Sequence, residues 1–417
     1  MNVLFLTLLD FETVDEHTIY TDLLREFIRN GHKVCGVSPV ERRKHERTRI
    51  IKEPGCCILK LRIGNTQKTH IIEKGISTLM IESQFIAGIK RYFSDIRFDL
   101  VLYATPPITL CKVVDYVKKR DSAESYLLLK DIFPQNAVDL KMMSKTGIRG
   151  LMYRKFRAQE EKLYACSDRI GCMSEANVSY VLKHNPKLRK RQEEALRISG
   201  YPVVEVCANS IEPTDITLSA SEKVRIREQY DLPTDRTIFV YGGNLGKPQG
   251  IDFMLKCLHS KQKNENVFFL IVGNGTEYIR IARYMERYKP QNARLYEWLP
   301  KEDYDRVVAS CDVGLIFLDY RFTIPNFPSR LLAYMDAGLP VLAVTDTATD
   351  IGKVITKGGF GWWCESNDVK RFSIQIKEIV KQHRDGRLPH YGAAARNYLH
   401  NHYTVAQAYR TIIKDHS

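Results

Sequence analysis

A helix between two apolar runs, within residues 313–344, is the feature that most limits what this chain can fold into. The runs 313–318 and 341–344 have the length and composition of buried strands. Between them, Ser329 is placed to begin a helix as its N-cap and Gly338 to end it. A strand, a helix and a second strand in this order form a βαβ unit, and the carboxyl ends of its strands present backbone N–H groups to an anion. We therefore expect this edge to hold a nucleotide's phosphates.

The same alternation of apolar runs and helix-forming stretches continues through the whole chain, which has 417 residues. This length suits two domains of roughly 200 residues each. The sequence predicts an α/β protein with two Rossmann-like domains that face each other across a cleft. We place the domains at residues 1–207 and 208–390, and expect a C-terminal helix, 391–417, to pack back on the first. Expected strands are 2–9, 32–39, 100–104, 125–130, 169–173, 237–241, 267–272 and 294–296.

The net charge of +14 lies mostly in the first half, where residues 1–200 contain 35 lysines and arginines but 24 acids. A basic surplus indicates an acidic partner: nucleic acid, an anionic membrane surface or a phosphorylated substrate. No basic stripe interleaved with aromatics and no nucleic-acid-binding module is present, so we expect no nucleic acid partner.

The ten cysteines show neither a CxxC pair nor a His/Cys metal spacing. This scatter is typical of reduced, mostly buried thiols in the cytoplasm. The first apolar run has no basic leader, and no run reaches the roughly 18 apolar residues that a membrane span needs. We expect a cytoplasmic protein with a peripheral place on the inner membrane face.

Three loops at the carboxyl ends of strands in the second half are candidates for binding a phosphorylated ligand. Each follows a strand directly, and glycines let backbone amides approach phosphate oxygens, while Lys247 and Arg330 add positive charge. Singly, such turn glycines are more often structural, but together they favour a phosphate site. The loops supply Gly243, Asn244, Gly246 and Lys247, then Gly273, Asn274 and Gly275, then Asn326, Phe327, Pro328, Ser329 and Arg330.

These loops resemble the donor half of a GT-B glycosyltransferase of family 4, in the O-antigen and capsule branch that includes fucosamine transferases. The similarity is carried by Val240-Tyr-Gly-Gly-Asn-Leu-Gly-Lys-Pro-Gln-Gly250, Ile271-Val-Gly-Asn-Gly275 and 326–340, and in the first half by 20–34, 64–75 and 130–134. It implies transfer of a sugar, with retention, from a nucleotide-sugar, expected to be a UDP-sugar. The implied acceptor is a polyprenyl-diphosphate-linked saccharide, and no metal or other cofactor is expected.

The resemblance also implies roles for individual residues. Lys247 and Arg330 match positions that hold the donor diphosphate, and Asn274 with Trp298 and Leu299 matches the loops around the base. Asp131 matches the side where acceptor and transferred sugar meet. One departure is that many family members carry two glutamates eight positions apart, where this chain has Pro325 and Ala333. Asp319 or Asp336 are weak candidates to replace them.

The mechanism leaves several interpretations open. If the enzyme retains, the leaving phosphate accepts the acceptor proton and Asp131 orients a hydroxyl; if it inverts, Asp131 is the base. A turn residue before Phe133-Pro134 is an equally good interpretation of Asp131. Asp303 and Asp305 have the D-x-D spelling of metal-dependent transferases, but a helix start is favoured. A nucleotide-sugar 2-epimerase on the same fold is the alternative function.

Two basic segments of the first half also have competing interpretations. Residues 64–74 either bind an acceptor pyrophosphate or form a solvated loop. Residues 141–162 interleave basic and apolar side chains, which is typical either of a helix resting on an anionic membrane or of one packed in the first domain.

Overall fold

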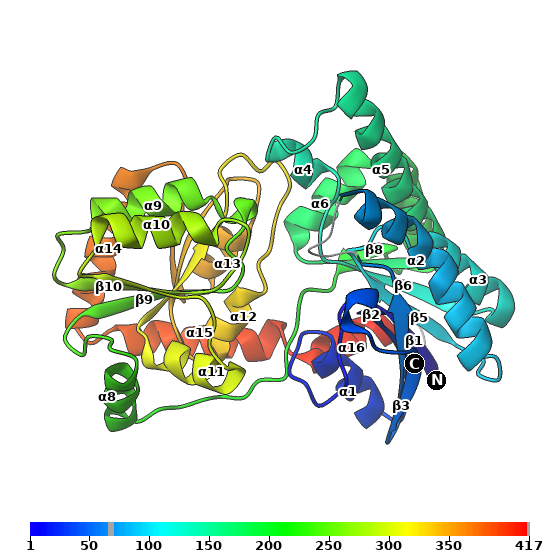
Figure 1. Cartoon of the computed structure of the whole chain (residues 1–417), viewed down its shortest axis with the longest axis horizontal. Coiled ribbons are helices and arrows are strands. Elements are labelled where there is room, and N and C mark those ends of the chain that lie inside the picture. Colours follow the sequence, from blue (N-terminus) through cyan, green and yellow to red (C-terminus); the bar gives the residue numbers. More distant parts are fainter. Residues whose placement is uncertain (66–70, 415–417) are drawn as a thin grey trace. The chain divides into compact units, whose positions relative to one another are not determined.

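The computed structural model describes residues 1–65 and 71–414 and divides them into two compact units (Figure 1). Unit 1 comprises Met1–Glu212 and Val405–Ser417, and unit 2 comprises Pro213–Thr404. The first boundary therefore lies five residues later than the expected end at residue 207. The expected helix 391–417 is wrong as a single element, because it divides between the two units at Thr404.

Unit 1 is built on one eight-stranded sheet in the order β3-β4-β2-β1-β5-β6-β7-β8. All neighbouring strands are parallel except β3, which pairs antiparallel with β4 at the edge. The order reverses between β1 and β5, and such a reversal is where ligands bind in open α/β sheets. The strands are β1 (Asn2–Leu6), β2 (Lys33–Glu41), β3 (Arg49–Glu53), β4 (Cys56–Ile63), β5 (Leu100–Ala104), β6 (Glu124–Leu129), β7 (Arg169–Cys172) and β8 (Val204–Val206).

Helices cover both faces of this sheet. On one face, α1 (Thr21–Arg29) and α16 (Val405–Ile413) lie side by side and bury Phe27 and Tyr409 against β1 and β5 (Figure 1). The helix α2 (Ile71–Tyr92) packs on β4 and on α3 (Cys111–Asp121), which in turn packs on α5 (Gly147–Cys166). The remaining helical elements are η1 (Arg42–Lys44), α4 (Gln135–Asp139), α6 (Glu175–His184) and α7 (Pro186–Ile198).

Unit 2 has a fully parallel six-stranded sheet in the order β11-β10-β9-β12-β13-β14. Numbered along the unit this is 3-2-1-4-5-6, the Rossmann order, and its reversal lies between β9 and β12. The central strands are buried along their whole length, as parallel strands covered on both faces must be. The strands are β9 (Thr237–Gly242), β10 (Val267–Val272), β11 (Ala293–Tyr296), β12 (Val313–Phe317), β13 (Val341–Thr345) and β14 (Gly361–Glu365).

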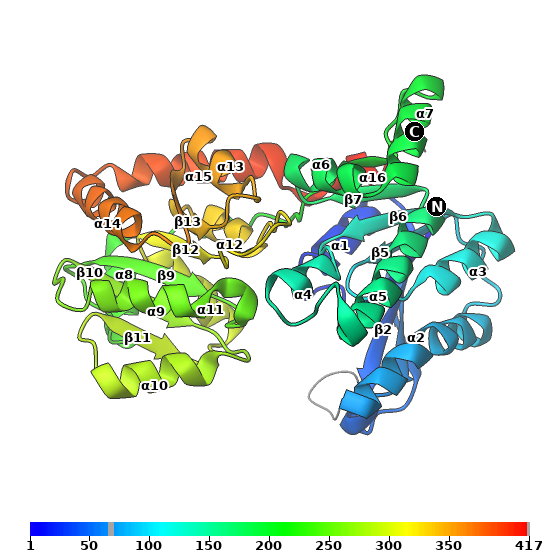
Figure 2. The same cartoon turned by 90° about the horizontal axis from the view of Figure 1, so that it is seen from above.

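The helices of unit 2 close both faces of its sheet. On one face α9 (Ile251–Ser260), α10 (Tyr278–Tyr288) and α14 (Val369–Arg384) share a buried core with the strands (Figure 2). Elsewhere α12 (Arg330–Asp336) packs on β12, on α11 (Lys301–Ser310) and on α15 (Leu388–His402). The unit also contains α8 (Ala220–Gln229), η2 (Lys247–Gln249) and α13 (Ile351–Lys357).

The structure also bears on the two basic segments and on membrane spanning. Of residues 64–74, positions 66–70 lie outside the described residues, so their acceptor role stays a prediction. Nearby, Arg42 of η1 and Asn65 both contact the carboxylate of Glu73. Within residues 1–65 and 71–414, every helix is too short or too polar to cross a bilayer.

Candidate functional site

The candidate site lies in unit 2, where the loops after β9 and β12 leave the sheet at the point of reversed strand order. The loop after β10 adjoins the loop after β9, because β9 and β10 pair along their length. Two of the three loops expected from the sequence are therefore neighbours at one sheet edge, and the third, which leads into α12, follows the adjacent strand β12.

The loops after β9 and β10 are joined backbone to backbone. The N–H of Gly243 donates to the carbonyl of Val272 at 2.9 Å, and that of Leu245 to the carbonyl of Asn274 at 2.8 Å. A Cβ on Gly273 would lie 1.9 Å from the carbonyl oxygen of Gly243, so only glycine permits this approach. The glycines thus bring the two loops together, while Gly243 and Asn244 remain exposed to solvent.

Arg330, the first residue of α12, carries a positive charge that no acid of the described residues neutralises. Its guanidinium stacks on the ring of Tyr241 at 4.3 Å, and one terminal nitrogen, Nη1, is buried without a hydrogen-bond partner. Burial alone lowers the pKa of this group, but Tyr241 and Tyr334 raise it above its ordinary value. A charged, buried donor without a partner is costly, and an anionic ligand is what would satisfy it.

Tyrosines hold Arg330 and the first glycine loop in place. The hydroxyl of Tyr334 donates to the carbonyl of Leu315 at 3.1 Å and accepts the N–H of Gly242 at 3.0 Å. The hydroxyl of Tyr304 occupies the space where a Cβ on Gly242 would lie. The sequence analysis assigned no role to Tyr241, Tyr304 or Tyr334, because their contacts join segments that are far apart in the sequence.

Lys247 is the second cation at this edge without an acidic partner among the described residues. It begins η2 and is exposed, directly after Gly246, whose N–H donates to the side-chain oxygen of Gln249 at 3.0 Å. Two positive groups on neighbouring loops, beside backbone amides freed by glycine, form an arrangement suited to a diphosphate.

The loops after β10 and β11 meet through Asn274. Its side-chain amide donates to Glu297 at 2.7 Å, and its oxygen accepts the N–H of Gly275 at 2.6 Å. Trp298 follows Glu297 and is 73% exposed, an unusual state for a tryptophan, while Leu299 is half-buried. An exposed flat ring next to ordered amides is suited to a planar ligand group.

The segment that leads into α12 differs in one respect from the expectation. Ser329 occupies the N-cap position, but its backbone is already helical and its side chain makes no capping hydrogen bond. The helix itself is only seven residues long. Phe327 is buried against Tyr403, Pro328 is half-buried, and the side-chain amide nitrogen of Asn326 is buried without a partner. The anion-binding potential therefore resides in Arg330 more than in a capped helix end.

The two aspartates weighed as replacements for the missing glutamates are both engaged elsewhere. Asp319 is paired with Arg321 through both carboxylate oxygens, at 2.8 and 2.7 Å. Asp336 accepts hydrogen bonds from the backbone and hydroxyl of Thr214, at 2.9 and 2.6 Å. Neither carboxylate is thus available to a ligand in this structure. Asp303 and Asp305 lie in the first turns of α11, where Asp305 pairs with Lys301.

Asp131 lies in unit 1, in the loop that follows β6. The hydroxyl of Thr105 fixes this loop by accepting the N–H groups of Lys130 and Asp131, at 3.0 and 3.2 Å. The carboxylate of Asp131 reaches solvent and forms no hydrogen bond or ion pair among the described residues. Desolvation by the protein around it raises the pKa of Asp131 above 3.8. Burial, together with the nearby charge of Asp131, raises the pKa of Tyr20. Burial also lowers the pKa of Lys130 to about 8, a feature that the sequence analysis missed.

The basic segment 141–162 presents part of its apolar side chains to solvent. Leu151 and Met152 of α5 are 61% and 59% exposed, beside the exposed Arg154 and Lys155. Phe156, in contrast, packs edge-on against Phe133 at 5.1 Å. Packing within unit 1 therefore accounts for Phe156 but leaves the pair Leu151 and Met152 uncovered.

Comparison with known proteins identifies the chemistry. Residues 222–397 match the family model of Glycosyl transferases group 1. A probable glycosyltransferase of Pseudomonas aeruginosa, WbjE, is 24% identical over 339 residues, which cover 81% of this chain and 79% of that protein. The protein is a glycosyltransferase. A second relative of the glycosyltransferase, the putative colanic acid biosynthesis glycosyl transferase WcaI of Escherichia coli K12, is 23% identical over 46% of this chain and 45% of that protein.

Solved structures confirm that the glycosyltransferase has the GT-B fold. Sucrose-phosphate synthase of Thermosynechococcus elongatus superposes with a TM-score of 0.74 at 14% identity, covering all of this chain and 98% of that one. The Anabaena protein HepE in complex with UDP superposes with a TM-score of 0.66 at 12% identity, covering all of this chain and 99% of that one. The group 1 match lies within unit 2 and spans the three loops described above.

Proposed function

We propose that this glycosyltransferase moves a sugar from a UDP-sugar to a lipid-linked saccharide during synthesis of a bacterial surface polysaccharide. The observation that carries the proposal is Arg330, a cation whose Nη1 nitrogen is buried without a partner, at the strand-order reversal of unit 2. The description of WcaI as a colanic acid biosynthesis enzyme supports a polysaccharide product. The UDP bound to HepE supports a UDP-linked donor.

In the proposed reaction, the bond between the anomeric carbon and the diphosphate breaks as the acceptor oxygen bonds to that carbon. Negative charge grows on the leaving diphosphate, and Arg330 and Lys247 stabilise it electrostatically. We propose retention, with the departing phosphate taking the acceptor proton and Asp131 orienting the acceptor hydroxyl. These cations do the work of a metal in this scheme, so the reaction proceeds without one.

The donor base is proposed to lie by Asn274, Trp298 and Leu299. Since neither Asp319 nor Asp336 is available, backbone groups and the amide of Asn326 are left to recognise the sugar and ribose hydroxyls. Gly243, Asn244, Gly246, Gly273 and Gly275 supply the backbone that surrounds the diphosphate.

The acceptor is proposed to be held on a lipid diphosphate at an anionic membrane surface. The exposed side chains of Leu151 and Met152, with Arg154 and Lys155 beside them, have the character of an interfacial helix, apolar side chains flanked by basic ones. This placement also agrees with the basic surplus of residues 1–200.

Binding of nucleotides to the purified protein tests the donor proposal. Calorimetric titration with UDP, GDP, UMP and UDP-sugars is expected to give measurable affinity for UDP and weaker affinity for UMP, which lacks the second phosphate. Indifference to all uridine nucleotides would refute the proposal, and preference for GDP would correct the base. Arg236, at the opposite end of β9 and paired with Asp235, provides a control cation whose removal leaves UDP binding unchanged.

Product analysis separates the transferase from the 2-epimerase. Incubation of a UDP-sugar with no acceptor is expected to leave the sugar configuration unchanged. With a polyprenyl-diphosphate saccharide and excess chelator, the transferase is expected to release UDP and to form product with the anomeric configuration of the donor.

A further inference from the structure

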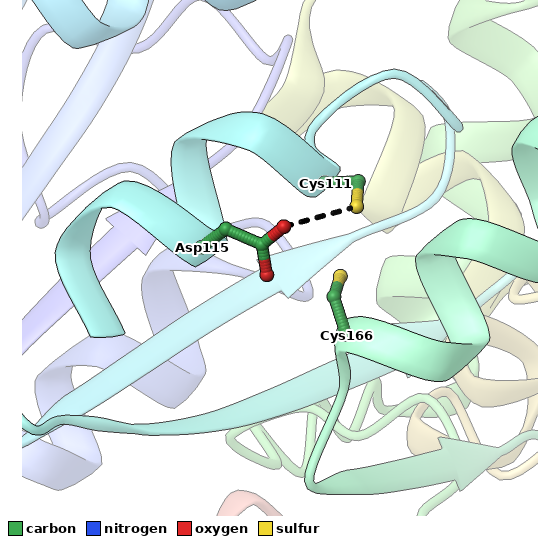
Figure 3. Close-up of side chains that lie close together, drawn as sticks. All are labelled: Cys111, Asp115 and Cys166. Atoms are coloured by element: carbon green, nitrogen blue, oxygen red, sulfur yellow. Dashed lines mark hydrogen bonds between the residues drawn. The ribbon is translucent and has the colours of Figure 1, made fainter. Parts of the chain in front are cut away.

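A second cluster of reactive side chains lies in unit 1, apart from the residues to which the proposed function assigns roles. It consists of Cys111, Asp115 and Cys166, whose sulfur and carboxylate oxygen atoms all lie within 4.8 Å of one another. Figure 3 shows the two sulfur atoms and the carboxylate pointing toward a common space between two helices. Both cysteines are free thiols.

The three side chains converge because of where the helices begin and end. Cys111 is the first residue of α3, and Asp115 follows one turn later, so both project from the same helix face. Cys166 is the last residue of α5, which packs on α3. The cysteines are far apart in sequence, which is why no metal-ligand spacing is visible in the chain.

The three side chains of the cluster are all electron donors. The nearby ammonium of Lys118 donates to the backbone carbonyl of Cys166 at 3.0 Å and pairs with Asp168 at 2.7 Å. The thiol of Cys111 lies 3.7 Å from the carboxylate of Asp115 and 3.7 Å from the carbonyl oxygen of Lys162. The thiol of Cys166 lies 3.3 Å from the carbonyl oxygen of Leu163. No lysine, arginine or histidine of the described residues pairs with Asp115, so its negative charge is unbalanced.

We propose that Cys111, Asp115 and Cys166 bind one thiophilic divalent cation of the zinc class. Two sulfurs and one carboxylate match the ligand preferences of Zn²⁺, and three protein ligands leave a fourth position for water. Tetrahedral zinc separates such ligand atoms by about 3.5 to 3.8 Å, given its bond lengths. Side-chain rotations that draw the three atoms together by roughly 1 Å are therefore enough to complete the site. The ion would join the start of α3 to the end of α5.

Binding converts two thiols to thiolates, and the two protons go to solvent while the metal–sulfur bonds form. Affinity for the metal is therefore expected to fall as the pH is lowered, because protons compete for the same sulfurs.

Cobalt spectroscopy on the full-length, reduced and chelator-treated protein tests the site without reference to transferase activity. Titration with Co²⁺ is expected to give one sulfur-to-cobalt charge-transfer band per chain, which Zn²⁺ abolishes by displacement. Zn²⁺ is also expected to raise the melting temperature of the wild type, since it binds only the folded state.

Three variants probe the ligands, and a fourth is the matched control. Cys111→Ser and Cys166→Ser are expected to abolish the charge-transfer band or weaken metal affinity at least tenfold. Asp115→Asn, isosteric and partly exposed, is expected to weaken affinity while keeping the melting temperature of the metal-free protein. Cys57→Ser, a partly buried thiol on β4, is expected to change nothing.

Two results would overturn the proposal. One is a wild-type cobalt spectrum without sulfur charge transfer, or a charge-transfer band that both cysteine variants keep with unchanged metal affinity. The other is a wild type that binds no metal when reduced and instead loses two hydrogens to a Cys111–Cys166 disulfide on exposure to hydrogen peroxide. Equal cobalt affinity of the wild type and Asp115→Asn would likewise exclude Asp115 as a ligand and argue against the three-ligand site.

Discussion

The two sheets share the order of the parallel strands around their reversal point, but the two units differ in the charge that they leave unpaired at the carboxyl ends of those strands. In unit 1, the loop after β1 carries Asp10 and Glu12, and both pair with the fully buried Lys60 of β4. In unit 2, the loop after β9 has glycines instead of acids, and Lys247 and Arg330 beside it have no acidic partner in the described part of the chain.

In unit 1, Asp10 and Glu12 of the first loop are therefore paired, whereas the carboxylate of Asp131, in the loop after β6, has no ion pair among the described residues. Unit 2 leaves cations free. The same strand order can thus carry unpaired negative charge in one unit and unpaired positive charge in the other. The loop residues therefore determine whether phosphate binds, and the fold determines only where the loops lie. This comparison predicts that removal of an unpaired charge lowers activity or ligand affinity, whereas removal of a paired charge lowers the free energy of unfolding.

Replacement of Asp131 by asparagine is expected to give the largest effect. If the carboxylate contacts the reacting acceptor hydroxyl, kcat falls by about 100-fold or more. Since its pKa is raised in the folded state, ionised Asp131 destabilises the fold as pH rises above 3.8, so the variant should melt at an equal or higher temperature. Steady-state kinetics measures kcat, and thermal melting at neutral pH measures the melting temperature of the wild type and the variant.

The pH profile sharpens this prediction. The acid limb of kcat/KM for the wild type is expected at a pKa above 3.8, because the carboxylate must be ionised to act. Asp95, exposed elsewhere in unit 1, is the control, and Asp95→Asn should keep both rate and profile. Full activity in Asp131→Asn would leave Asp131 with only its turn role.

Replacement of Lys60 by methionine is expected to lower the free energy of unfolding by about 2 to 3 kcal/mol, because Asp10 and Glu12 lose their buried counter-charge. Lys44 also pairs with Asp10, but it is half exposed, so Lys44→Met should cost less than about 1 kcal/mol. Urea unfolding measures the difference. UDP affinity should not change in either variant, and a loss of affinity would contradict the division of roles between the units.

The pairs around Asp10 also give the fold a pH dependence. Although desolvation opposes it, hydrogen bonds from Lys44 and Lys60 lower the pKa of Asp10 below 3.8. The contribution is therefore complete above pH 3.8 and lost as the pH falls through the lowered pKa. In Lys60→Met this acid-side loss should shrink.

Replacement of Arg330 by methionine is expected to weaken UDP binding about 30-fold, since charge-assisted hydrogen bonds of this kind contribute roughly 2 kcal/mol. The stability of the nucleotide-free protein should be unchanged or higher, because a buried nitrogen without a partner disappears. Titration calorimetry and melting curves of Arg330→Met and Arg236→Met provide the comparison. If Arg330→Met melts at a lower temperature but binds UDP as tightly as the wild type, Arg330 has a structural role and does not bind the diphosphate.

The double variant Leu151→Ser with Met152→Ser is expected to give the smallest effect, about tenfold weaker partitioning onto anionic vesicles, because two exposed apolar side chains no longer enter the interface. Vesicle sedimentation measures it. Ile374 of α14 is similarly exposed in unit 2, and Ile374→Ser is the control. Equal partitioning of both variants would place the membrane contact elsewhere.

Much of the fold was predictable because apolar runs mark buried parallel strands clearly. The run 313–318 indeed contains β12, and the GT-B class is confirmed. Other elements gave weaker signals. In β4, Lys60 occupies a fully buried position, so a charge interrupts the apolar pattern that would reveal the strand. The helix α7 is strongly charged, with few apolar positions to mark it, and was missed.

The loops of the candidate site were predictable, but the interactions that position them were not. Glycine patterns pointed to residues 242–246 and 273–275, and their contact follows from the pairing of β9 with β10. The stacking of Arg330 on Tyr241 joins residues 89 positions apart in the sequence, and no local pattern encodes it. The same holds for the approach of Cys111 to Cys166, and for the hydrogen bonds from Thr214 to Asp336.

The course of the chain through the two units has a mechanical consequence. The N–H of Val405 donates to the carbonyl of Ile211 at 3.1 Å, so the chain leaves and re-enters unit 1 at adjacent points. Unit 2 is thus inserted into the sequence of unit 1, and β1 and α16 both belong to unit 1. Tension applied at Asn2 of β1 and Ile413 of α16 would load unit 1 alone, and unit 2 would bear no force until unit 1 had opened. In an optical trap, unit 1 should therefore always rupture first, even if it is the more stable of the two.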